Sequence, residues 1–273
     1  MERQPIDRFH EVFGTRKPVI AMVHLAALPG TPLYDAERGI AAIVEAARAD
    51  LVNLQRAGVD AVMFGNENDR PYELQVDPAS TAAMAYVIGR LADEIKRPFG
   101  VDVLWDPMST MALAAATGAR FVREIFTGLY GSDMGLWEGA AAKALRYRRL
   151  LGLDRLLCLF NVSAEFAAPL DARSLPARAK SAVFSSLADA VLVSGAITGE
   201  AVPLGHLAAV KAALPNMPVL ANTGVTHENV TAILDACDGI IVGTALKVDG
   251  ITWNPVDPHR AEAFMTLVRA ARG

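Results

Sequence analysis

The feature of the sequence that most constrains the fold is a repeated pattern, in which an apolar run ends at glycine or polar residues and a helix-like segment follows. The segments AGVDAVMFGNEN, TGARFVREIFTG, LADAVLVSGAITG and ACDGIIVGTALK show it, at intervals of roughly 30 to 60 residues. Most of the runs are continuously apolar rather than alternating, which is typical of strands buried on both faces of a parallel sheet. The pattern therefore predicts repeated βα units.

Eight segments of this kind are predicted strands. They span residues 18–25, 59–65, 99–105, 120–126, 155–161, 189–195, 217–223 and 239–244. Helical patterns alternate with them, for example at 36–58, 203–215, 226–236 and 256–273, and no linker or low-complexity tract interrupts the series. The sequence predicts an α/β fold, a single (β/α)8 TIM barrel over residues 1–273, with a doubly wound open sheet as the alternative.

Composition favours a core that needs neither disulfides nor metals, because 52% of the 273 residues are apolar and the mean hydropathy is +0.27. Cys158 and Cys237 lie inside apolar runs and are predicted to be small core residues in a reducing compartment. The 26 basic and 30 acidic residues form no basic block, which argues against a nucleic-acid partner. The N-terminal segment lacks an apolar signal region, and no run approaches the ~20 apolar residues of a membrane span. We expect a cytoplasmic protein.

In a barrel of this type, the active site forms where the carboxyl ends of the strands meet the following loops. The predicted catalytic residues at these ends are His24, Glu67, Asp102 and Glu124. A carboxylate inside an apolar strand is costly unless it is paired, so Asp102 and Glu124 are expected to point into this mouth of the barrel. The three carboxylates are candidates for acid/base chemistry or for binding Mg²⁺, the candidate cofactor.

These catalytic candidates have structural alternatives. His24 would also fit a core histidine that donates to a backbone carbonyl, and the strand carboxylates would also fit an ion pair with Arg123 or Arg120. The glycine-spaced segment 128–135 lacks a dinucleotide fingerprint and is interpreted as a mobile loop over the mouth, of the kind that acts as a lid.

The last three strand ends are predicted to hold phosphate or a similar anion, since barrels frequently use the loops after strands seven and eight for this purpose. The residues assigned to this cradle are Ser194, Gly195, Thr198, Gly199, Asn222, Thr223, Gly224, Gly243, Thr244 and Lys247. Thr226 is expected to cap the next helix, while Asn68, Trp105 and Asn161 are predicted to contact the rest of the substrate. The alternative is that the cradle residues serve only as turn and cap residues.

The chain resembles the BtpA/SgcQ family in five motifs that together cover nearly its whole length. They are PVIAMVHLAALPGTPLY, DAVMFGNENDRPY, LVSGAITG, NTGVTHENV and DGIIVGTALKVDG. The resemblance implies a cytoplasmic TIM barrel of the ribulose-phosphate-binding kind, in a family whose named members are associated with photosystem I biogenesis or sugar operons. The matched positions are His24, Pro29, Gly30, Glu67, Asn68, Ser194, Gly195, Thr198, Gly199, Gly224, Asn229, Gly243, Thr244 and Lys247.

The chain departs from the usual family pattern at three places. An Asn-Val-Leu-Arg-Asn-like stretch is replaced by residues 102–106 (DVLWD), a Lys-His pair by Glu165-Phe166, and a Gly-Ser-Gly pattern by Asn222-Thr223-Gly224. Basic groups are thus exchanged for acids, which indicates a substrate different from that of the typical member.

Two functional hypotheses follow. The first is an enzyme that acts on a small anionic, phosphorylated or sugar- or nucleoside-like metabolite by isomerisation, lyase chemistry or glycosidic cleavage. The alternative is a non-catalytic assembly factor of the photosystem I biogenesis type, although no amphipathic stripe or basic face announces a partner surface. In either case the alanine-rich surface helices favour a homo-oligomer.

Overall fold

The structure, a computed structural model, describes residues 5–272, and its central element is a closed barrel of eight parallel strands. The barrel order is β1-β2-β3-β4-β7-β9-β10-β11, and β1 closes the ring by pairing with β11. The strands are β1 (Val19–His24), β2 (Ala61–Gly65), β3 (Phe99–Asp102), β4 (Phe121–Glu124), β7 (Leu157–Asn161), β9 (Ala190–Val193), β10 (Val219–Ala221) and β11 (Ile240–Val242). Each lies within one of the eight predicted strand segments, so the TIM-barrel prediction is confirmed and the open-sheet alternative is excluded.

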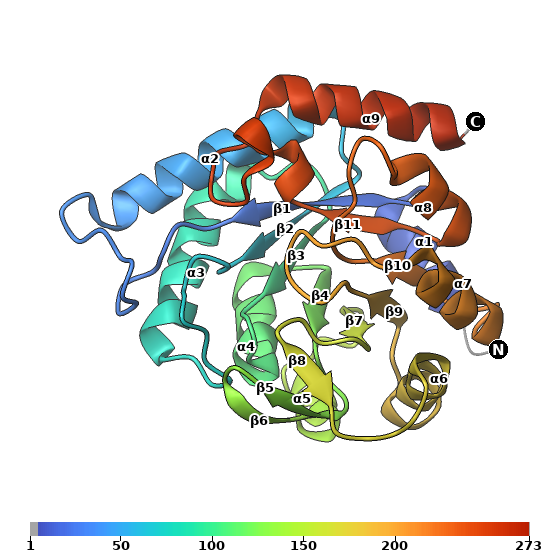
Figure 1. Ribbon diagram of the computed structural model, residues 1–273. Helices are drawn as coiled ribbons and strands as arrows, with labels where there is room; N and C mark the ends of the chain where they lie inside the picture. The colour runs from blue at the N-terminus through green and yellow to red at the C-terminus, as the bar shows by residue number, and fades with distance from the viewer. Residues whose placement is uncertain (1–4, 273) are drawn as a thin grey trace.

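One helix follows each barrel strand and packs on the outside of the ring (Figure 1). These helices are α2 (Gly39–Ala57), α3 (Pro78–Leu91), α4 (Pro107–Thr117), α5 (Ala141–Leu150), α6 (Leu175–Ser186), α7 (Leu204–Ala213), α8 (Val230–Ala236) and α9 (Pro258–Arg272). Short 3-10 turns are η1 (Ala92–Glu94), η2 (Thr244–Leu246) and η3 (Val248–Gly250). Gly58 ends α2 with a left-handed φ of 86°, as expected of a C-terminal cap. None of the helices within residues 5–272 is long and apolar enough to cross a membrane.

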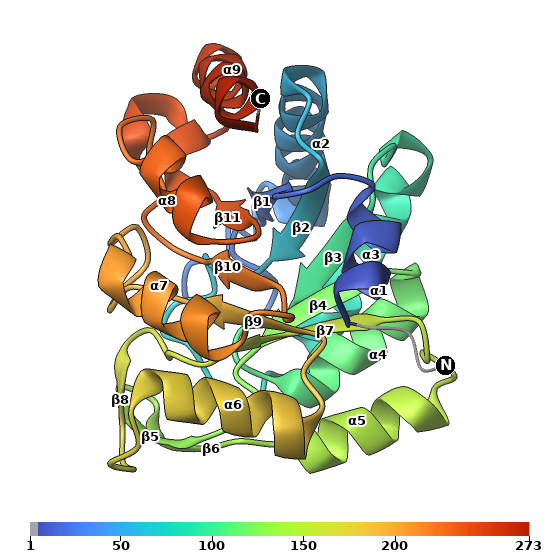
Figure 2. The same ribbon diagram turned by 90° about the vertical axis from the view of Figure 1, so that its right-hand side faces the viewer.

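The N-terminal end of the barrel is closed by α1 (Pro5–Phe13), which the sequence analysis did not predict (Figure 2). Phe9, Val12 and Phe13 are buried in one apolar cluster with the inward-facing side chains of the strands. The Phe13 ring lies 5.1 Å from that of Phe121 on β4. Within residues 5–272, α1 therefore closes this end of the barrel interior.

At the opposite end, a three-stranded antiparallel sheet stands beside the mouth. It consists of β5 (Leu129–Ser132), β6 (Gly135–Glu138) and β8 (Ala167–Pro169), in the order β6-β5-β8. The glycine-spaced segment interpreted as a mobile loop is therefore a β-hairpin paired with a third strand. Tyr130 and Trp137 anchor the hairpin, since both are buried in a cluster with Leu104 and Trp105 above β3.

Two smaller expectations are also resolved. Helix α8 begins at Val230, so Thr226 does not cap it; the Thr226 amide instead donates to Oδ1 of Asn229 over 2.7 Å. Cys158 and Cys237 are both buried and unpaired, in agreement with their prediction as core residues.

Candidate functional site

The inner face of the barrel is apolar along the strands and becomes polar at the mouth. Since side chains alternate along each strand, every second residue faces the interior. On β9, for example, Ala190 and Leu192 face the interior, whereas Val191 and Val193 pack beneath the helices. On each strand, the next inward-facing position beyond the last apolar one lies at the mouth. These eight positions form a ring of polar side chains and glycines around the top of the barrel interior. The ring comprises His24, Gly65, Asp102, Arg123, Asn161, Ser194, Asn222 and Gly243.

A cavity of about 290 Å³ opens above this ring. Its floor is formed by His24, Glu67, Arg123, Glu165 and Asn222, of which all but His24 are buried to at least nine-tenths. Its walls are formed by the loops after β3, β9, β10 and β11. The predicted site residues that line it are His24, Glu67, Trp105, Thr198, Gly199, Asn222, Thr223, Gly224, Gly243 and Thr244.

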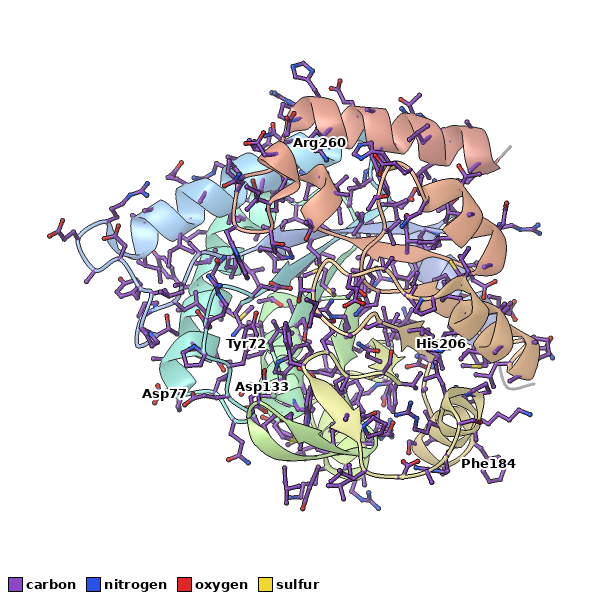
Figure 3. All side chains as sticks on the ribbon, in the orientation of Figure 1. Tyr72, Asp77, Asp133, Phe184, His206 and Arg260 are labelled. Atoms are coloured by element: carbon purple, nitrogen blue, oxygen red, sulfur yellow. The ribbon has the colours of Figure 1, made fainter. Side chains whose placement is uncertain are left out.

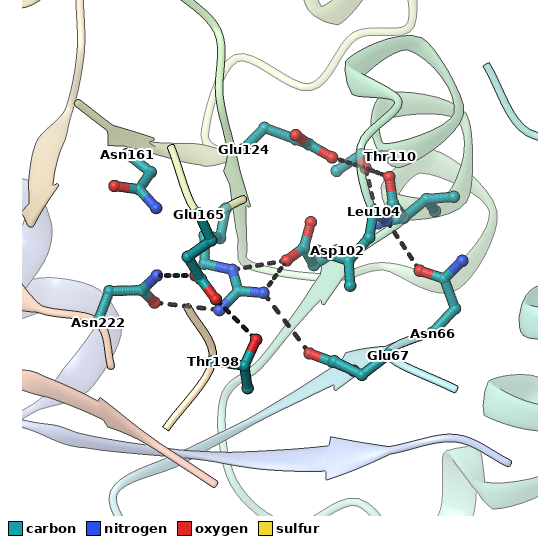
Figure 4. A network of polar contacts seen from close by, with 12 residues as sticks. Asn66, Glu67, Asp102, Leu104, Thr110, Glu124, Asn161, Glu165, Thr198 and Asn222 are labelled. Atoms are coloured by element: carbon teal, nitrogen blue, oxygen red, sulfur yellow. Dashed lines mark hydrogen bonds and ion pairs between the residues drawn. The ribbon is translucent and has the colours of Figure 1, made fainter. Parts of the chain in front are cut away.

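Arg123 is the centre of the polar network on the floor (Figure 4). Its Nε donates to Oδ2 of Asp102 over 2.6 Å, its Nη2 contacts the same oxygen, and its Nη1 donates to Oδ1 of Asn222 over 3.0 Å. Oε1 of Glu67 lies 3.6 Å from Nη2. Asp102 thus forms the structural ion pair considered in the sequence analysis, and it lies beneath the guanidinium instead of lining the cavity.

Glu124 was expected to point into the mouth, but the structure places it on the opposite face of β4. Arg123 takes the inward position, and the next side chain must point outward, where Glu124 accepts from Thr110 Oγ1 of α4 over 3.2 Å. Burial, followed by the negative charge of Asp102, raises the pKa of Glu124 well above its usual value. A protonated Glu124 can donate to Asp102, whose Oδ1 otherwise has no partner among the described residues.

Two buried carboxylates remain that face the cavity, Glu67 and Glu165. Burial raises the pKa of both Glu67 and Glu165. The positive charge of Arg123 lowers both pKa values but offsets the effect of burial only in part. Oε2 of Glu67 has no hydrogen-bond partner within residues 5–272, whereas Glu165 accepts from Thr198 Oγ1 over 2.8 Å and from Asn222 Nδ2 over 3.4 Å. Figure 4 shows the two acids apart from each other, Glu165 beside Asn222 and Glu67 beside Asn66. Buried carboxyl groups with a raised pKa that line a cavity are candidates for acid/base chemistry.

His24 contributes a neutral imidazole to the same floor. Burial first, and then the nearby charges of Lys247 and Arg123, lower the pKa of His24 to about 3. Its Nε2 lies 3.6 Å from Oε1 of Glu67, and its Nδ1 has no partner in the described part of the chain. The ring is therefore a hydrogen-bonding group rather than a charge at neutral pH.

The opposite wall offers backbone amides, beside the exposed side chain of Glu228. Gly199, Gly224, Val225 and Thr244 line the cavity, and none of their backbone amides donates to another group among residues 5–272. A Cβ at Gly224 would meet the amide nitrogen of Ala201 at 2.1 Å, so only glycine lets the loops after β9 and β10 come this close. Unsatisfied amides converging from three loops are the groups that bind anions in proteins.

One cation stands beside this wall. Arg260 of α9 lines the cavity, and its Nε donates to the carbonyl oxygen of Ala245 over 3.1 Å. In the part of the chain that the structure describes, its guanidinium has no carboxylate partner within ion-pair distance, so its remaining N–H groups are available to a ligand. Arg260 was not among the predicted site residues, because it lies on a helix rather than at a strand end.

Sequence comparison identifies the family. A model of the BtpA family matches residues 15–270. The chain belongs to the BtpA family. It is 47% identical to the sgc region protein SgcQ of Escherichia coli over 262 residues, covering 96% of this chain and 98% of that protein. It is 34% identical to the photosystem I biogenesis protein BtpA of Synechocystis sp., covering 93% and 89%.

Solved structures agree with the BtpA-family barrel at the level of the fold. The phosphoribosyl anthranilate isomerase from Thermococcus kodakaraensis superimposes with a TM-score of 0.54 at 16% identity, covering 93% of this chain and 99% of that one. A dihydropteroate synthase from Xanthomonas albilineans gives 0.56 at 16% identity, covering 93% and 92%. At such identities the similarity establishes the TIM barrel alone.

Several predicted site residues of this BtpA-family chain lie behind the cavity wall and position it. Asn68 Nδ2 donates to the Leu25 carbonyl oxygen over 2.6 Å. Ser194 Oγ accepts from the side-chain amides of both Asn161 and Asn222 over 2.7 Å. The Gly195 backbone amide donates to Thr223 Oγ1.

Lys247 is held away from the predicted anion cradle. Its Nζ lies 2.6 Å from Oδ2 of Asp50 on α2, and both side chains are buried. Oδ1 of the same carboxylate accepts from the Val256 amide over 2.7 Å. The pair therefore ties the loop after β11 to α2, and this cation does not line the cavity.

The predicted metal ligands are not arranged as a metal site. Arg123 occupies the position between Glu67 and Asp102, and Glu124 faces α4. Within the described residues, no group of three or more His, Cys, Asp or Glu side chains is placed to hold a metal ion. Arg123 and Glu165, named from the sequence only as a possible ion-pair partner and as a departure from the family pattern, also lie on the floor of the cavity. A charged residue inside an apolar strand and an acid in the loop after strand five were the available signals.

Proposed function

We propose that this BtpA-family chain is an enzyme that binds a small phosphorylated or sugar-like metabolite at the barrel mouth and moves protons within it. The observation that supports this proposal is the division of one cavity into two chemically different sides. Free amides and the Arg260 guanidinium form one side, and the Glu67 and Glu165 carboxyl groups form the other. The first side suits a phosphate or carboxylate, and the second suits acid/base chemistry.

The floor is suited to proton transfer next to a carbonyl or hemiacetal group. Glu67, with an unpartnered Oε2, would act as the base that removes a proton from a carbon or hydroxyl group of the substrate. Glu165, in its protonated form, would return a proton to the oxygen on which charge develops. Arg123, which hydrogen bonds to Asp102 and Asn222 already hold in place, and the neutral His24 would donate hydrogen bonds to that oxygen.

The test combines binding with solvent exchange. Pentose and hexose phosphates are screened for a rise in melting temperature, and those that bind are incubated with the protein in D₂O and examined by NMR for deuterium at carbon. We expect at least one to stabilise the protein and to exchange, with exchange lost in Glu67→Gln and Glu165→Gln while binding remains. If no sugar phosphate stabilises the protein, the proposal is overturned.

The alternative function, a non-catalytic assembly factor, draws support from the name of the Synechocystis relative and from an exposed apolar face. Phe184 and Leu187, on and directly after α6, have exposed fractions of 90% and 67% (Figure 3). In that case Phe184→Ser would abolish capture of a protein partner, and Glu67→Gln would leave it unchanged.

A further inference from the structure

A second cavity adjoins the one described above, and its chemistry is different. It measures about 360 Å³ and is lined mainly by aromatic and aliphatic side chains from five loops. The lining side chains that carry the argument are Arg70, Tyr72, Met134, Phe166, Ile197 and Trp253. Together they form an apolar cleft, named here the outer cleft, at the rim of the barrel mouth.

The outer cleft and the inner cavity are neighbours that share a wall. Thr198 lines both of them, and its hydroxyl donates to Glu165 on the inner floor. Thr252 of the outer cleft and Thr244 of the inner cavity are joined by a hydrogen bond of 2.8 Å between their hydroxyl oxygens. The two cavities are therefore adjacent at the barrel mouth.

The aromatic side chains of the outer cleft are fixed, and part of their surface is open. Tyr72 donates its hydroxyl to the Glu67 carbonyl oxygen over 2.9 Å, and its ring lies 6.1 Å from that of Trp105 and 6.0 Å from that of Phe166. Trp253 and Ile197 remain 44% and 49% exposed although they face a concave site. Rigid aromatic surface of this kind gains binding energy by stacking on a planar ring.

Polar groups at the edge of the cleft favour a ring that carries heteroatoms. The Arg70 guanidinium lies 3.7 Å from the centre of the Trp253 ring, and its buried Nε has no hydrogen-bond partner among the described residues. The Asp133 carboxylate lines the same cleft from the β5–β6 hairpin, on the side of the mouth where Tyr72 lies (Figure 3). A donor and an acceptor are thus available at the rim of an otherwise apolar site.

We propose that the outer cleft binds an aromatic heterocycle of the nucleobase type that belongs to the same ligand whose anionic end occupies the inner cavity. This inference rests on the proposed function and narrows its substrate class from sugar phosphates in general to phosphorylated sugars that carry an aromatic ring. The ring packs against Phe166 and the face of Trp253 that the Arg70 guanidinium leaves open, and Asp133 contacts its edge.

The test compares ligands that differ only in the ring. Dissociation constants for ribose 5-phosphate, the ribonucleoside 5′-monophosphates and free adenosine are measured by calorimetry with the full chain. We expect the best monophosphate to bind about tenfold more tightly than ribose 5-phosphate, or better, as stacking on one aromatic side chain provides. Equal affinities for ribose 5-phosphate and every monophosphate overturn the inference, but leave the proposed function standing.

Variants assign the effect to the cleft. Trp253→Ala is expected to bring the best monophosphate down to the affinity of ribose 5-phosphate without changing the affinity for ribose 5-phosphate itself. Trp253→Phe retains the preference, and Phe184→Ala, which removes an exposed aromatic ring far from the mouth, is the matched control and changes neither affinity. A preference that survives in Trp253→Ala contradicts the assignment.

The two proposals fail in different ways. Binding of adenosine without binding of any phosphorylated ligand supports the ring site and overturns the anion site of the proposed function. Binding of ribose 5-phosphate without a preference for the monophosphates supports the anion site and overturns the ring site. If none of these probes binds, the inference about the outer cleft is overturned, and the screen of pentose and hexose phosphates decides the proposed function.

Discussion

The guanidinium of Arg123 lies directly over the carboxylate of Asp102, with Nε 2.6 Å from Oδ2, and neither side chain is more than slightly exposed. Because a buried charge without its partner is expensive, we expect Asp102→Asn and Arg123→Met each to lower the free energy of unfolding by about 3–5 kcal/mol. Urea denaturation monitored by circular dichroism measures both effects. The double variant should cost clearly less than the sum of the two, whereas additive losses would show that the two groups are not coupled.

Glu67 should oppose folding in its ionised form. Burial raises its folded-state pKa above the unfolded value, so the folded chain binds this proton more tightly, and the penalty grows as pH rises through that window. Glu67→Gln removes the penalty and is therefore expected to raise the unfolding free energy more at pH 8 than at pH 5, while catalysis is lost. Urea titrations at both pH values measure the difference.

The control for this prediction is Glu228→Gln, because Glu228 lines the same cavity but is exposed. It should change stability by less than about 0.5 kcal/mol at either pH. If Glu67→Gln were instead destabilising at pH 8, the ionised carboxylate would be stabilised by its surroundings, and its assignment as a base would lose its support.

The barrel could be predicted from the sequence because its determinants are local. A strand buried on both faces, such as β9, must be a continuous apolar run, and the polar residues directly after it must lie at the mouth. The same rule correctly predicted that His24, Glu67 and Asn222 lie together at the barrel mouth, where they line one cavity. It failed for Glu124, because the side of a strand on which a residue lies depends on a register that a single run of letters does not fix.

The remaining errors concern contacts between distant segments. Lys247 forms an ion pair with Asp50, which lies 197 residues away on a helix. No sequence pattern near either residue predicts this pair. Arg260 reaches the cavity from α9, beyond any strand end. The hairpin β5–β6 was interpreted as a loop because its glycines suggest mobility, whereas the packing of Tyr130 and Trp137 against Trp105 orders it.

His24 should remain neutral under mildly acidic conditions. With its pKa lowered to about 3 by burial and the neighbouring cations, its ring resonances are expected not to shift between pH 8 and pH 5 in an NMR titration. His24→Asn, which removes one of the five histidines, identifies the signal. Since the unfolded chain binds this proton below about pH 6.5 and the folded chain does not, His24 should also cost stability as pH falls, by about 2 kcal/mol at pH 5. A normal titration midpoint would show that the imidazole is solvated.

Gly224→Ala tests the close approach of the anion loops. The φ of Gly224 is +60°, and the added methyl group would meet the Ala201 amide nitrogen at 2.1 Å, so the two loops must separate. We expect a loss of about 1–3 kcal/mol in stability and at least tenfold weaker binding of sugar phosphates. The matched change Gly205→Ala, on α7 with nothing within 4 Å, should be neutral or slightly stabilising. Equal behaviour of the two variants would remove the structural argument for the cradle.

Variants of Lys247 test whether this side chain serves the buried ion pair with Asp50 or binds the anionic group of a substrate. If it serves the Asp50 pair, Lys247→Met should lower the unfolding free energy by about 3–5 kcal/mol because the Asp50 charge is left buried. Adding Asp50→Asn to the same chain should restore part of this loss, since the substituted side chain is neutral. The double variant should then bind sugar phosphates as the parent does, as measured by calorimetry, while Arg260→Met weakens binding severalfold. Loss of sugar-phosphate binding in the double variant would instead show that Lys247 contributes to the anion site.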